Sequence, residues 1–320
     1  MRALITGVAG FVGGHLTEHL NAATDWEVWG NVRDPGDMRF VVPGVRAVIA
    51  DLRNPQAAHD LIEQIQPDFV FHLAAQAFVP QSWADPWDTY ETNLRSQINL
   101  FEALLQHRPS VRVLVIGSNE EYGLAGAESL SVREDSPLRP DSPYGVSKIA
   151  QDFMGLQYAL SRNLQAVRVR PFNHIGPRQS EKFVASSFAQ QIAAIEAGLV
   201  PPVVKVGNLA AQRDFTDVRD MVCAYRLAIT LGEVGEVYNI GSGKPCSIQR
   251  VLDILLGFST LPIRVEVDPD RLSLRPTDNP VSYCDASKFI ARTGWAPAIP
   301  LEQTLRDVLD DWRKRIRETP

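Results

Sequence analysis

Cysteine is scarce in this sequence, with three among 320 residues, at positions 223, 246 and 284. The odd number and the wide spacing argue against both a disulfide framework and a zinc site. We therefore expect reduced thiols, a cytoplasmic protein and no bound metal. Long hydrophobic runs are also missing, since none reaches the roughly 18 residues that span a bilayer. The start MRALITGVAGFVGG has no secretory cleavage site, so we expect no membrane partner.

An excess of positive charge is missing as well. The chain has 32 basic and 38 acidic residues, a formal net charge of -6. This balance argues against nucleic acid or an anionic membrane surface as the main partner, although a few local arginines can still bind an anionic ligand. An apolar content of 45% excludes disorder as the main state. The length corresponds to about two domains at roughly 150 residues each.

Short apolar strands alternate with longer helical patterns in the first half of the chain. This alternation predicts an α/β fold with a Rossmann-type doubly wound parallel sheet covered on both faces. Frequent prolines after Arg170 indicate a smaller α/β lobe that binds the substrate. We assign residues 1–171 and 216–241 to an NAD(P)-binding domain, and residues 172–215 and 242–320 to the lobe. The strands expected in the sheet are Ala3–Thr6, Glu27–Val32, Val45–Ala50, Phe69–Leu73, Val111–Ile116, Gln165–Arg170 and Glu236–Ile240.

A glycine triad follows the first strand directly. Gly7, Gly10 and Gly13 have the spacing GxxGxxG, and Phe11 and Val12 open the following helix. Glycines let the backbone approach a pyrophosphate closely, and a helix N-terminus favours its negative charge. The alternative is a tight strand–helix turn without a ligand. The position within a strand–helix–strand unit favours a dinucleotide, NADP(H) or NAD(H).

The ends of the second and third strands bear on which dinucleotide binds. Arg33 favours the 2′-phosphate of NADP, whereas the adjacent Asp34 favours a free ribose. A solvated charge pair is the alternative. Asp51 and Leu52 suit the adenine edge, but Asp51 could instead cap the helix that begins at Pro55.

Tyr144 and Lys148 carry the second chemical signal. At i and i+4 on a predicted helix, both side chains lie on one face. A nearby ammonium lowers the pKa of a phenol from about 10 by favouring the phenolate, which makes it an acid–base catalyst near neutral pH. Ser118 follows a parallel strand, where open α/β sheets place their ligands. The alternatives are a surface Tyr–Lys pair and a serine that caps a turn.

With these motifs, the chain resembles the extended short-chain dehydrogenase/reductase family that acts on nucleotide sugars. The resemblance covers nearly the whole chain, and within the family it is greatest to GDP-mannose 4,6-dehydratases and GDP-6-deoxy-4-keto-mannose reductases. It is carried by TGVAGFVG, ADLRN, HLAAQ, GSNEEYG, YGVSK, RPFNHIGPRQS, GNLAAQRDFTDVRD, YNIGSG and RPTDNP.

The resemblance implies roles for particular residues. It implies a catalytic triad of Ser118, Tyr144 and Lys148. For the cofactor it implies the glycine turn and nine further residues. These are Arg33, Asp51, Leu52, Leu73, Ala74, Ala75, Gln76, Tyr144 and Lys148. For a GDP-sugar it implies Ser118, Asn119, Glu120, Asn173, Val184, Asn208, Arg213 and Arg275. The implied reaction is NAD(P)H-dependent reduction of the C4 ketone of a GDP-4-keto-6-deoxy-hexose to GDP-rhamnose or an epimer.

Glu120 keeps a second reaction open. In the related dehydratases a glutamate at this position is the base that removes the C5 proton, so a GDP-mannose 4,6-dehydratase with recycled NADP is the main alternative. The short segment after the second strand favours the reductase. A nucleotide-sugar 4-epimerase and a non-catalytic dinucleotide sensor are less favoured, the sensor because Ser118, Tyr144 and Lys148 are all present.

The family resemblance also implies a homodimer. The amphipathic helices expected at Thr89–Gln106 and Tyr144–Leu160 would pair across a two-fold axis as a four-helix bundle. From periodicity alone, the second apolar stripe of each helix could instead face the core.

Overall fold

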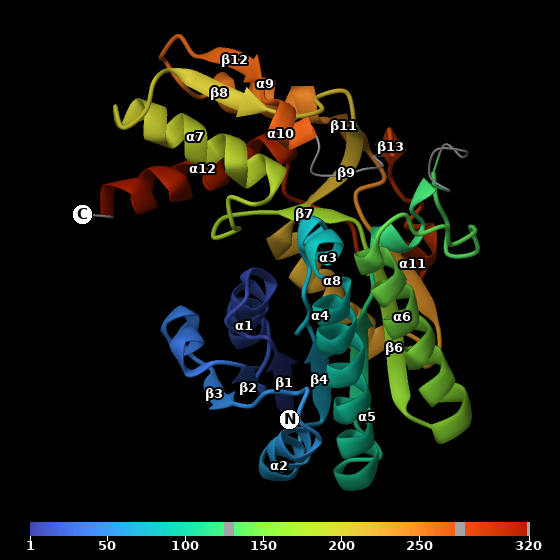
Figure 1. Ribbon diagram of the computed structural model, residues 1–320. Coiled ribbons are helices and arrows are strands. Elements are labelled where there is room, and N and C mark those ends of the chain that lie inside the picture. Colours follow the sequence, from blue (N-terminus) through green and yellow to red (C-terminus); the bar gives the residue numbers. More distant parts are fainter. Residues whose placement is uncertain (125–130, 273–278, 319–320) are drawn as a thin grey trace.

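The computed structural model describes residues 1–124, 131–272 and 279–318. A large sheet with helices on both faces forms the lower part of the molecule in Figure 1, and a smaller lobe that contains the C-terminal helix lies above it. Arg275, one of the expected substrate residues, lies outside the described residues.

The large sheet confirms the predicted fold class. Its strands lie in the order β10-β6-β5-β4-β1-β2-β3, and every neighbouring pair is parallel. Because the order reverses at β1, the sheet is doubly wound. Its strands are β1 (Arg2–Thr6), β2 (Glu27–Val32), β3 (Arg46–Ile49), β4 (Phe69–His72), β5 (Arg112–Ile116), β6 (Gln165–Pro171) and β10 (Val237–Ile240).

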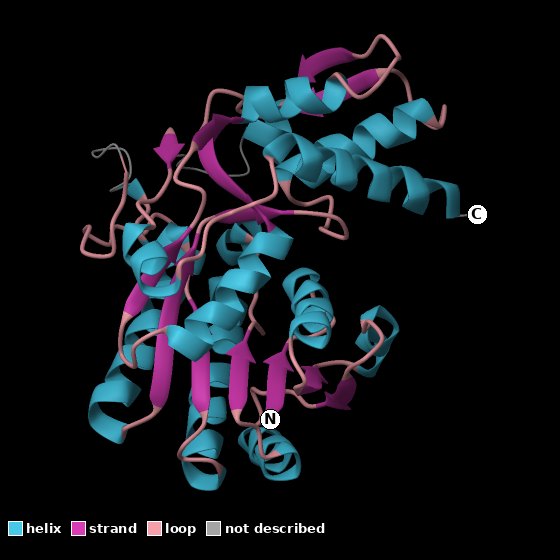
Figure 2. Cartoon of the chain, turned by 180° about the vertical axis from the view of Figure 1, so that it is seen from behind, coloured by secondary structure: helices cyan, strands magenta, loops and turns pink. Residues whose placement is uncertain are grey.

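Two apolar cores hold helices against the two faces of this sheet (Figure 2). One core joins it to α1 (Phe11–Ala23) and α8 (Val218–Leu231) through side chains such as Leu16 and Val222. The other joins it to α2 (Pro55–Ile65), α5 (Ser96–His107) and α6 (Pro143–Arg162) through side chains such as Leu61 and Leu100. Burial on both faces explains why the central strands are mainly apolar in sequence.

The helix expected at Thr89–Gln106 is divided in the structure. It comprises α4 (Pro86–Tyr90), a π-helical turn (Glu91–Arg95) and α5. Asn93 lies in the π turn and is fully buried. Its amide accepts a hydrogen bond from the Gln76 N–H at 2.8 Å and donates one to the Ser147 hydroxyl at 2.9 Å. These tertiary contacts, which no local pattern encodes, account for the irregular turn.

The smaller lobe has its own core, in which α7, α9 and α12 pack together beside β8 and β12. A second small sheet, with β7 and β9 paired in parallel, connects it to the large sheet. These elements are α7 (Val184–Glu196), α9 (Ile248–Leu256), α12 (Leu301–Glu318), β7 (Asn173–Ile175), β8 (Val203–Val206), β9 (Gln212–Asp217), β11 (Pro245–Ser247), β12 (Arg264–Val267) and β13 (Val281–Ser282).

The bounds of the two domains stay a prediction. One segment assigned to the lobe, α11 (Ser287–Thr293), lies near α8 and β10, and Phe289 and Trp295 join the core of the large sheet. The three cysteines are free thiols. Within the described ranges, no helix is both long and apolar enough to cross a membrane.

Candidate active site at the carboxyl edge of the sheet

The loops that follow β1 to β5 all lie at one edge of the large sheet, because parallel strands end on the same side. The structure thus brings the expected cofactor and catalytic residues to the edge that faces the lobe (Figure 1). The described residues expected for the substrate come from the loop after β5, from β7, α7 and β9, and from the turn after β8.

The glycine turn fits a pyrophosphate. Gly7 has a φ of +68°, and a Cβ there would lie 3.0 Å from the Cα of Ala74 in the loop after β4. A Cβ on Gly13 would lie 2.7 Å from the carbonyl oxygens of Gly7 and Val8. Gly10 is the N-cap of α1, and no side chain caps this helix. Its first N–H groups therefore remain available to an anionic ligand, and the helix dipole favours one.

Two buried polar side chains, which the sequence reasoning missed, brace this turn. The Thr6 hydroxyl accepts a hydrogen bond from the Ala74 N–H at 3.0 Å and bonds the His72 Nδ1 at 3.0 Å. The Asn31 amide accepts from the Gly7 N–H at 3.2 Å and donates to the Ala50 carbonyl at 2.7 Å. Their signal in the sequence is a single polar residue at the end of an apolar strand.

The adenosine side of the edge carries Arg33, Asp51 and Leu52. Arg33 is half exposed after β2 and pairs with Asp34 at 3.0 Å. Asp51 pairs with Arg53 at 2.7 Å, and this hydrogen-bonded guanidinium lowers the pKa of the Asp51 carboxyl. Asp51 does not cap α2, because Asn54 does: its side chain accepts from the Gln56 N–H at 2.9 Å.

The loop Leu73–Gln76 follows β4 and is anchored by its last residue. Gln76 donates to the Thr89 hydroxyl at 3.0 Å and accepts from the Phe78 N–H at 2.5 Å. Its side chain is therefore engaged within the protein. That this loop contacts the cofactor stays a prediction.

Ser118, Tyr144 and Lys148 are all buried at the centre of the edge, with exposed fractions of 6%, 8% and 4%. Ser142 caps α6 by accepting from the Gly145 N–H at 3.1 Å, which fixes the helical turn that carries Tyr144. The Lys148 ammonium lies 5.8 Å from the centre of the Tyr144 ring and donates to the Ile116 carbonyl at 2.9 Å. The Ser118 hydroxyl accepts from the Glu120 N–H at 3.1 Å. The serine therefore caps a turn, and its own O–H remains a potential donor.

Burial changes the acid–base properties of this centre. Desolvation lowers the pKa of Lys148 to about 8, although the Glu121 carboxylate opposes this effect. Burial and the Lys148 charge lower the pKa of His72 to about 3, so this imidazole is neutral at neutral pH. His72 is then a buried neutral residue that makes one hydrogen bond, to the Thr6 hydroxyl.

A buried charged network lies behind Ser118. Glu121 is fully buried, and its carboxylate accepts from the Ser118 N–H at 2.8 Å. Arg170 lies 2.9 Å from that carboxylate and 2.6 Å from Asp152, which also pairs with Arg168 at 3.0 Å. Burial raises the pKa of Glu121, and Arg170 opposes this rise. Glu121 was not predicted as a site residue.

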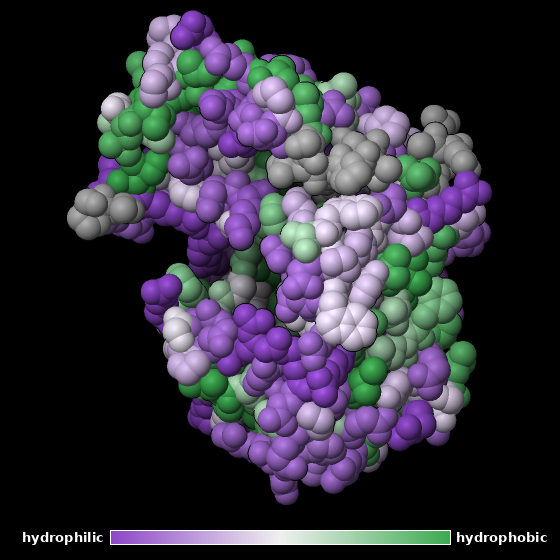
Figure 3. All heavy atoms as spheres, in the orientation of Figure 1, coloured by the Kyte–Doolittle hydropathy of each residue, from purple (hydrophilic) through white to green (hydrophobic). Residues whose placement is uncertain are grey.

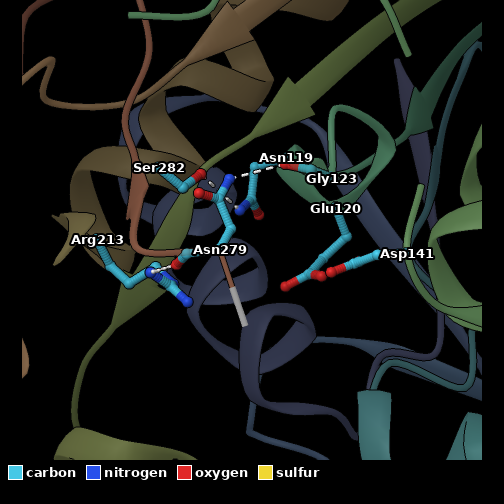
Figure 4. A pocket seen from close by; sticks show the side chains of 7 residues that line it. All are labelled: Asn119, Glu120, Gly123, Asp141, Arg213, Asn279 and Ser282. Atoms are coloured by element: carbon cyan, nitrogen blue, oxygen red, sulfur yellow. Dashed lines mark hydrogen bonds between the residues drawn. The ribbon is translucent and has the colours of Figure 1, made fainter. Parts of the chain in front are cut away.

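A pocket opens beside this centre, between the loop after β5 and the lobe (Figure 4). Its lining residues are Asn119, Glu120, Gly123, Asp141, Arg213, Asn279 and Ser282. The Glu120 and Asp141 side chains point toward one another on one side. Arg213 lies opposite, where it donates to the carbonyls of Gln212 and Asn279, both at 2.8 Å.

Asn279 and Ser282 were not predicted as site residues. Asn279 donates to the Gly123 carbonyl at 2.7 Å, and Ser282 accepts from the Asn119 amide at 3.4 Å. Both contacts fasten the lobe to the loop after β5. The available signal was the RPTDNP motif, which ends at Pro280.

The remaining expected substrate residues are more dispersed. Asn173 begins β7, and its buried Oδ1 has no hydrogen-bond partner within the described part of the chain. Val184 begins α7 and is partly buried. Asn208 is exposed in the turn after β8, where it accepts from the Ala210 N–H at 3.0 Å. Across the described ranges, no group of three or more potential ligand side chains could hold a metal ion.

Comparisons with known proteins agree with this geometry. The profile of a family described as GDP-mannose 4,6 dehydratase matches residues 4–308. The GDP-6-deoxy-D-mannose reductase of Pseudomonas aeruginosa is 35% identical over 318 residues, which cover 99% of both chains. The GDP-mannose 4,6 dehydratase 1 of Arabidopsis thaliana is 27% identical, over 97% of this chain and 89% of that protein.

Solved structures resemble the whole chain. The structure of RMD from Pseudomonas aeruginosa complexed with NADPH superposes with a TM-score of 0.87 and 34% identity, over 98% of this chain and 99% of that one. The Thermus thermophilus UDP-glucose 4-epimerase complexed with NAD gives a TM-score of 0.85 and 30% identity, with coverage of 98% and 99%. Both of these structures hold a nicotinamide dinucleotide. The glycine turn of this chain fits the pyrophosphate of such a cofactor.

Proposed function

The chain belongs to the GDP-mannose 4,6 dehydratase family of nucleotide-sugar enzymes, and from this premise we propose that it reduces the C4 ketone of GDP-6-deoxy-4-keto-mannose to GDP-rhamnose. The reductant is NADPH or NADH. The observation that carries the proposal is the 35% identity to a reductase over the full length, against 27% to a plant dehydratase.

The residues around Tyr144 suit this reduction. The nicotinamide supplies the hydride when the cofactor is bound. Tyr144 donates its phenolic proton to O4 as the ketone becomes an alcohol. The Ser118 hydroxyl oxygen accepts from the Glu120 N–H, so the O–H proton is available to donate a hydrogen bond to the same substrate oxygen. The Lys148 ammonium, 5.8 Å from the ring centre, stabilises the phenolate that remains.

The substrate would bind where the loop after β5 meets the lobe. Arg213 suits the diphosphate, because a guanidinium matches phosphate oxygens in geometry and charge. Asn173 suits a hydroxyl or amine of the ligand, because its buried Oδ1 lacks a partner among the described residues. Asn119 and Glu120 line the same pocket.

One observation supports a second candidate, GDP-mannose 4,6-dehydratase activity. Glu120 lines the pocket, where a base for the C5 proton would be needed. This reaction would convert GDP-mannose with no net use of nicotinamide, because the hydride that leaves C4 returns at C6. Glu120→Gln would abolish the dehydration and leave the C4 reduction intact.

The deciding experiment is an NMR analysis of products from two incubations. With GDP-6-deoxy-4-keto-mannose and NADPH, we expect GDP-rhamnose and a stoichiometric loss of NADPH absorbance, which Tyr144→Phe abolishes. With GDP-mannose and NADP alone, we expect no product. Product in the second incubation supports the dehydratase. A C4 epimer formed without net use of NADPH would indicate an epimerase, and cofactor binding without turnover would indicate a sensor.

Two further features belong to the same proposal. The free thiols fit a reducing cytoplasm. A homodimer through α5 and α6 fits the exposed apolar side chains of these helices, which include Ile98 and Phe153 with exposed fractions of 41% and 49%. Figure 3 shows apolar side chains gathered on the right of this view, over α6.

A further inference from the structure

Glu121 stands out because the reaction proposed above gives it no role, although it contacts the catalytic loop directly. Its side chain is fully buried one turn from Ser118. Hydrophobic burial does not explain a carboxylate at such a place, since an unpaired buried charge is strongly destabilising. Two sets of neighbours stabilise the buried carboxylate: the backbone of Ser118 and a group of charged side chains.

The first partner is the backbone of Ser118. One carboxylate oxygen accepts the Ser118 N–H at 2.8 Å, while the Ser118 hydroxyl accepts from the same short turn, which makes a reciprocal capping box. Gly117 permits this arrangement, because a Cβ there would collide with that carboxylate oxygen. The Gly117 N–H is itself held by the Val169 carbonyl at 2.7 Å. The position of Ser118 is therefore set by Glu121 on one side and by β6 on the other.

The second set of partners is electrostatic. Arg170 lies 2.9 Å from the other carboxylate oxygen, and its own Nε–H hydrogen bond goes to Asp152. The Glu121 carboxylate also raises the pKa of the Lys148 ammonium, against the effect of burial. The charged and titratable groups that face Glu121 and Lys148 are His72, Tyr122, Tyr144, Asp152, Arg168 and Arg170.

This cluster holds more positive than negative charge even with Glu121 present. Lys148, Arg168 and Arg170 contribute three positive charges, and Asp152 supplies one of the two negative charges. Removing the Glu121 carboxylate would therefore leave a larger positive excess around Lys148 and Tyr144. A positive excess favours loss of a proton from this pair, whichever of the two groups releases it.

We propose that Glu121 is a positioning residue for the reduction, which fixes the backbone of Ser118 and offsets the buried positive charge beside Tyr144. This inference rests on the proposed function, because it assumes that Ser118, Tyr144 and Lys148 act on the substrate. The proposed role of Glu121 has two parts. The geometric part depends on the position of the carboxylate relative to the Ser118 N–H, and the electrostatic part depends on its negative charge.

Two substitutions separate these parts. Glu121→Gln keeps an oxygen for the Ser118 N–H and removes the charge, so the alkaline limb of the pH profile of kcat/KM should move to lower pH by about one unit. Glu121→Asp keeps the charge and withdraws it by one methylene, so kcat should fall by about tenfold with the alkaline limb unmoved. Glu196→Gln is the control. It removes a carboxylate that pairs with Arg313 at 2.7 Å in the lobe, and it should leave both quantities at wild-type values.

A titration without substrate separates this inference from the proposed function. In protein labelled with 13C at the lysine Cε, the Lys148 signal is identified by its loss in Lys148→Arg. Its midpoint should lie lower in Glu121→Gln than in the wild type and in Glu196→Gln. An unmoved midpoint overturns the electrostatic role even if the wild type reduces the ketone.

A wild type that reduces nothing overturns the proposed function, whereas the titration still decides whether Glu121 affects Lys148. If Glu121→Gln fails to fold, Glu121→Asp decides: a wild-type kcat overturns the inference, and a tenfold loss supports it.

Discussion

At the scale of single residues, Lys148 sets the pH range in which the enzyme should work. Burial lowers the pKa of its ammonium to about 8, well below that of an exposed lysine. The charged form that stabilises the Tyr144 phenolate therefore predominates below about pH 8 and is lost as the pH rises through that value. We expect kcat/KM for ketone reduction to fall above about pH 8. A profile that stays flat to pH 10 would contradict this role.

Arg33 should determine the choice between the two dinucleotides. It lies at the end of β2, half exposed, with only the neighbouring Asp34 paired to it in the described structure at 3.0 Å. A hydrogen bond to a charged group contributes roughly 1.5–3 kcal/mol, which corresponds to about 10–100-fold in affinity. We expect Arg33→Ala to raise the Kd of NADPH by that factor and to leave the Kd of NADH nearly unchanged. Equal effects on both cofactors, measured by fluorescence titration, would show that Arg33 does not contact the 2′-phosphate.

At the scale of elements, the N-cap of α6 should affect both the stability of the protein and its catalytic rate. The Ser142 hydroxyl caps its N-terminus two residues before Tyr144. Loss of an N-cap costs about 1 kcal/mol, and here it also frees the turn that carries the phenol. We expect Ser142→Ala to lower both the free energy of unfolding in urea and kcat. Ser161→Ala, near the exposed end of the same helix, is the control and should change neither. A full kcat in Ser142→Ala would show that the helix holds Tyr144 without its cap.

The elements also show where sequence reasoning succeeds. All seven strands of the large sheet were predicted, because burial on both faces of the central strands makes their runs mainly apolar. The strands β7, β9, β11 and β13 were not predicted as strands. β13 has two residues and β9 reads QRDFTD, so neither has a pattern of its own, and both form through pairing with distant segments.

The residues of the site likewise fall into those that a local sequence pattern reveals and those that only tertiary contacts bring together. The glycine turn and the Tyr144–Lys148 pair have fixed spacings within one element, so the sequence reveals them. Asp141, Asn279 and Ser282 line the pocket only because the lobe folds back onto the loop after β5. The π-helical turn at Asn93 depends likewise on partners that lie 17 and 54 residues away. Such contacts have no local signature.

At the scale of the whole molecule, the outer face of α6 presents an unexplained apolar stripe. Val146, Phe153 and Leu160 have exposed fractions of 44%, 49% and 75%, and they follow one another at seven-residue intervals. Residues spaced by seven lie on one side of a helix. Ile98 on α5 is also exposed, at 41%. A two-fold axis beside these helices would bury the stripe in a four-helix bundle, since an apolar stripe of this kind marks an interaction surface.

We therefore expect the wild type to sediment as a dimer and the double variant Phe153→Asp with Leu160→Asp to sediment as a monomer, because each aspartate would have to lose its hydration in the bundle. Leu199→Asp is the matched control. That leucine is 66% exposed but lies after α7 in the lobe, away from the stripe, so its variant should remain dimeric. Analytical ultracentrifugation at micromolar concentration distinguishes these outcomes.

A wild type of monomer mass would refute the dimer, and a double variant that remains dimeric would place the interface elsewhere. Because Tyr144 lies on the same helix, the monomeric variant should also lose kcat if the bundle helps to hold the turn that carries the phenol.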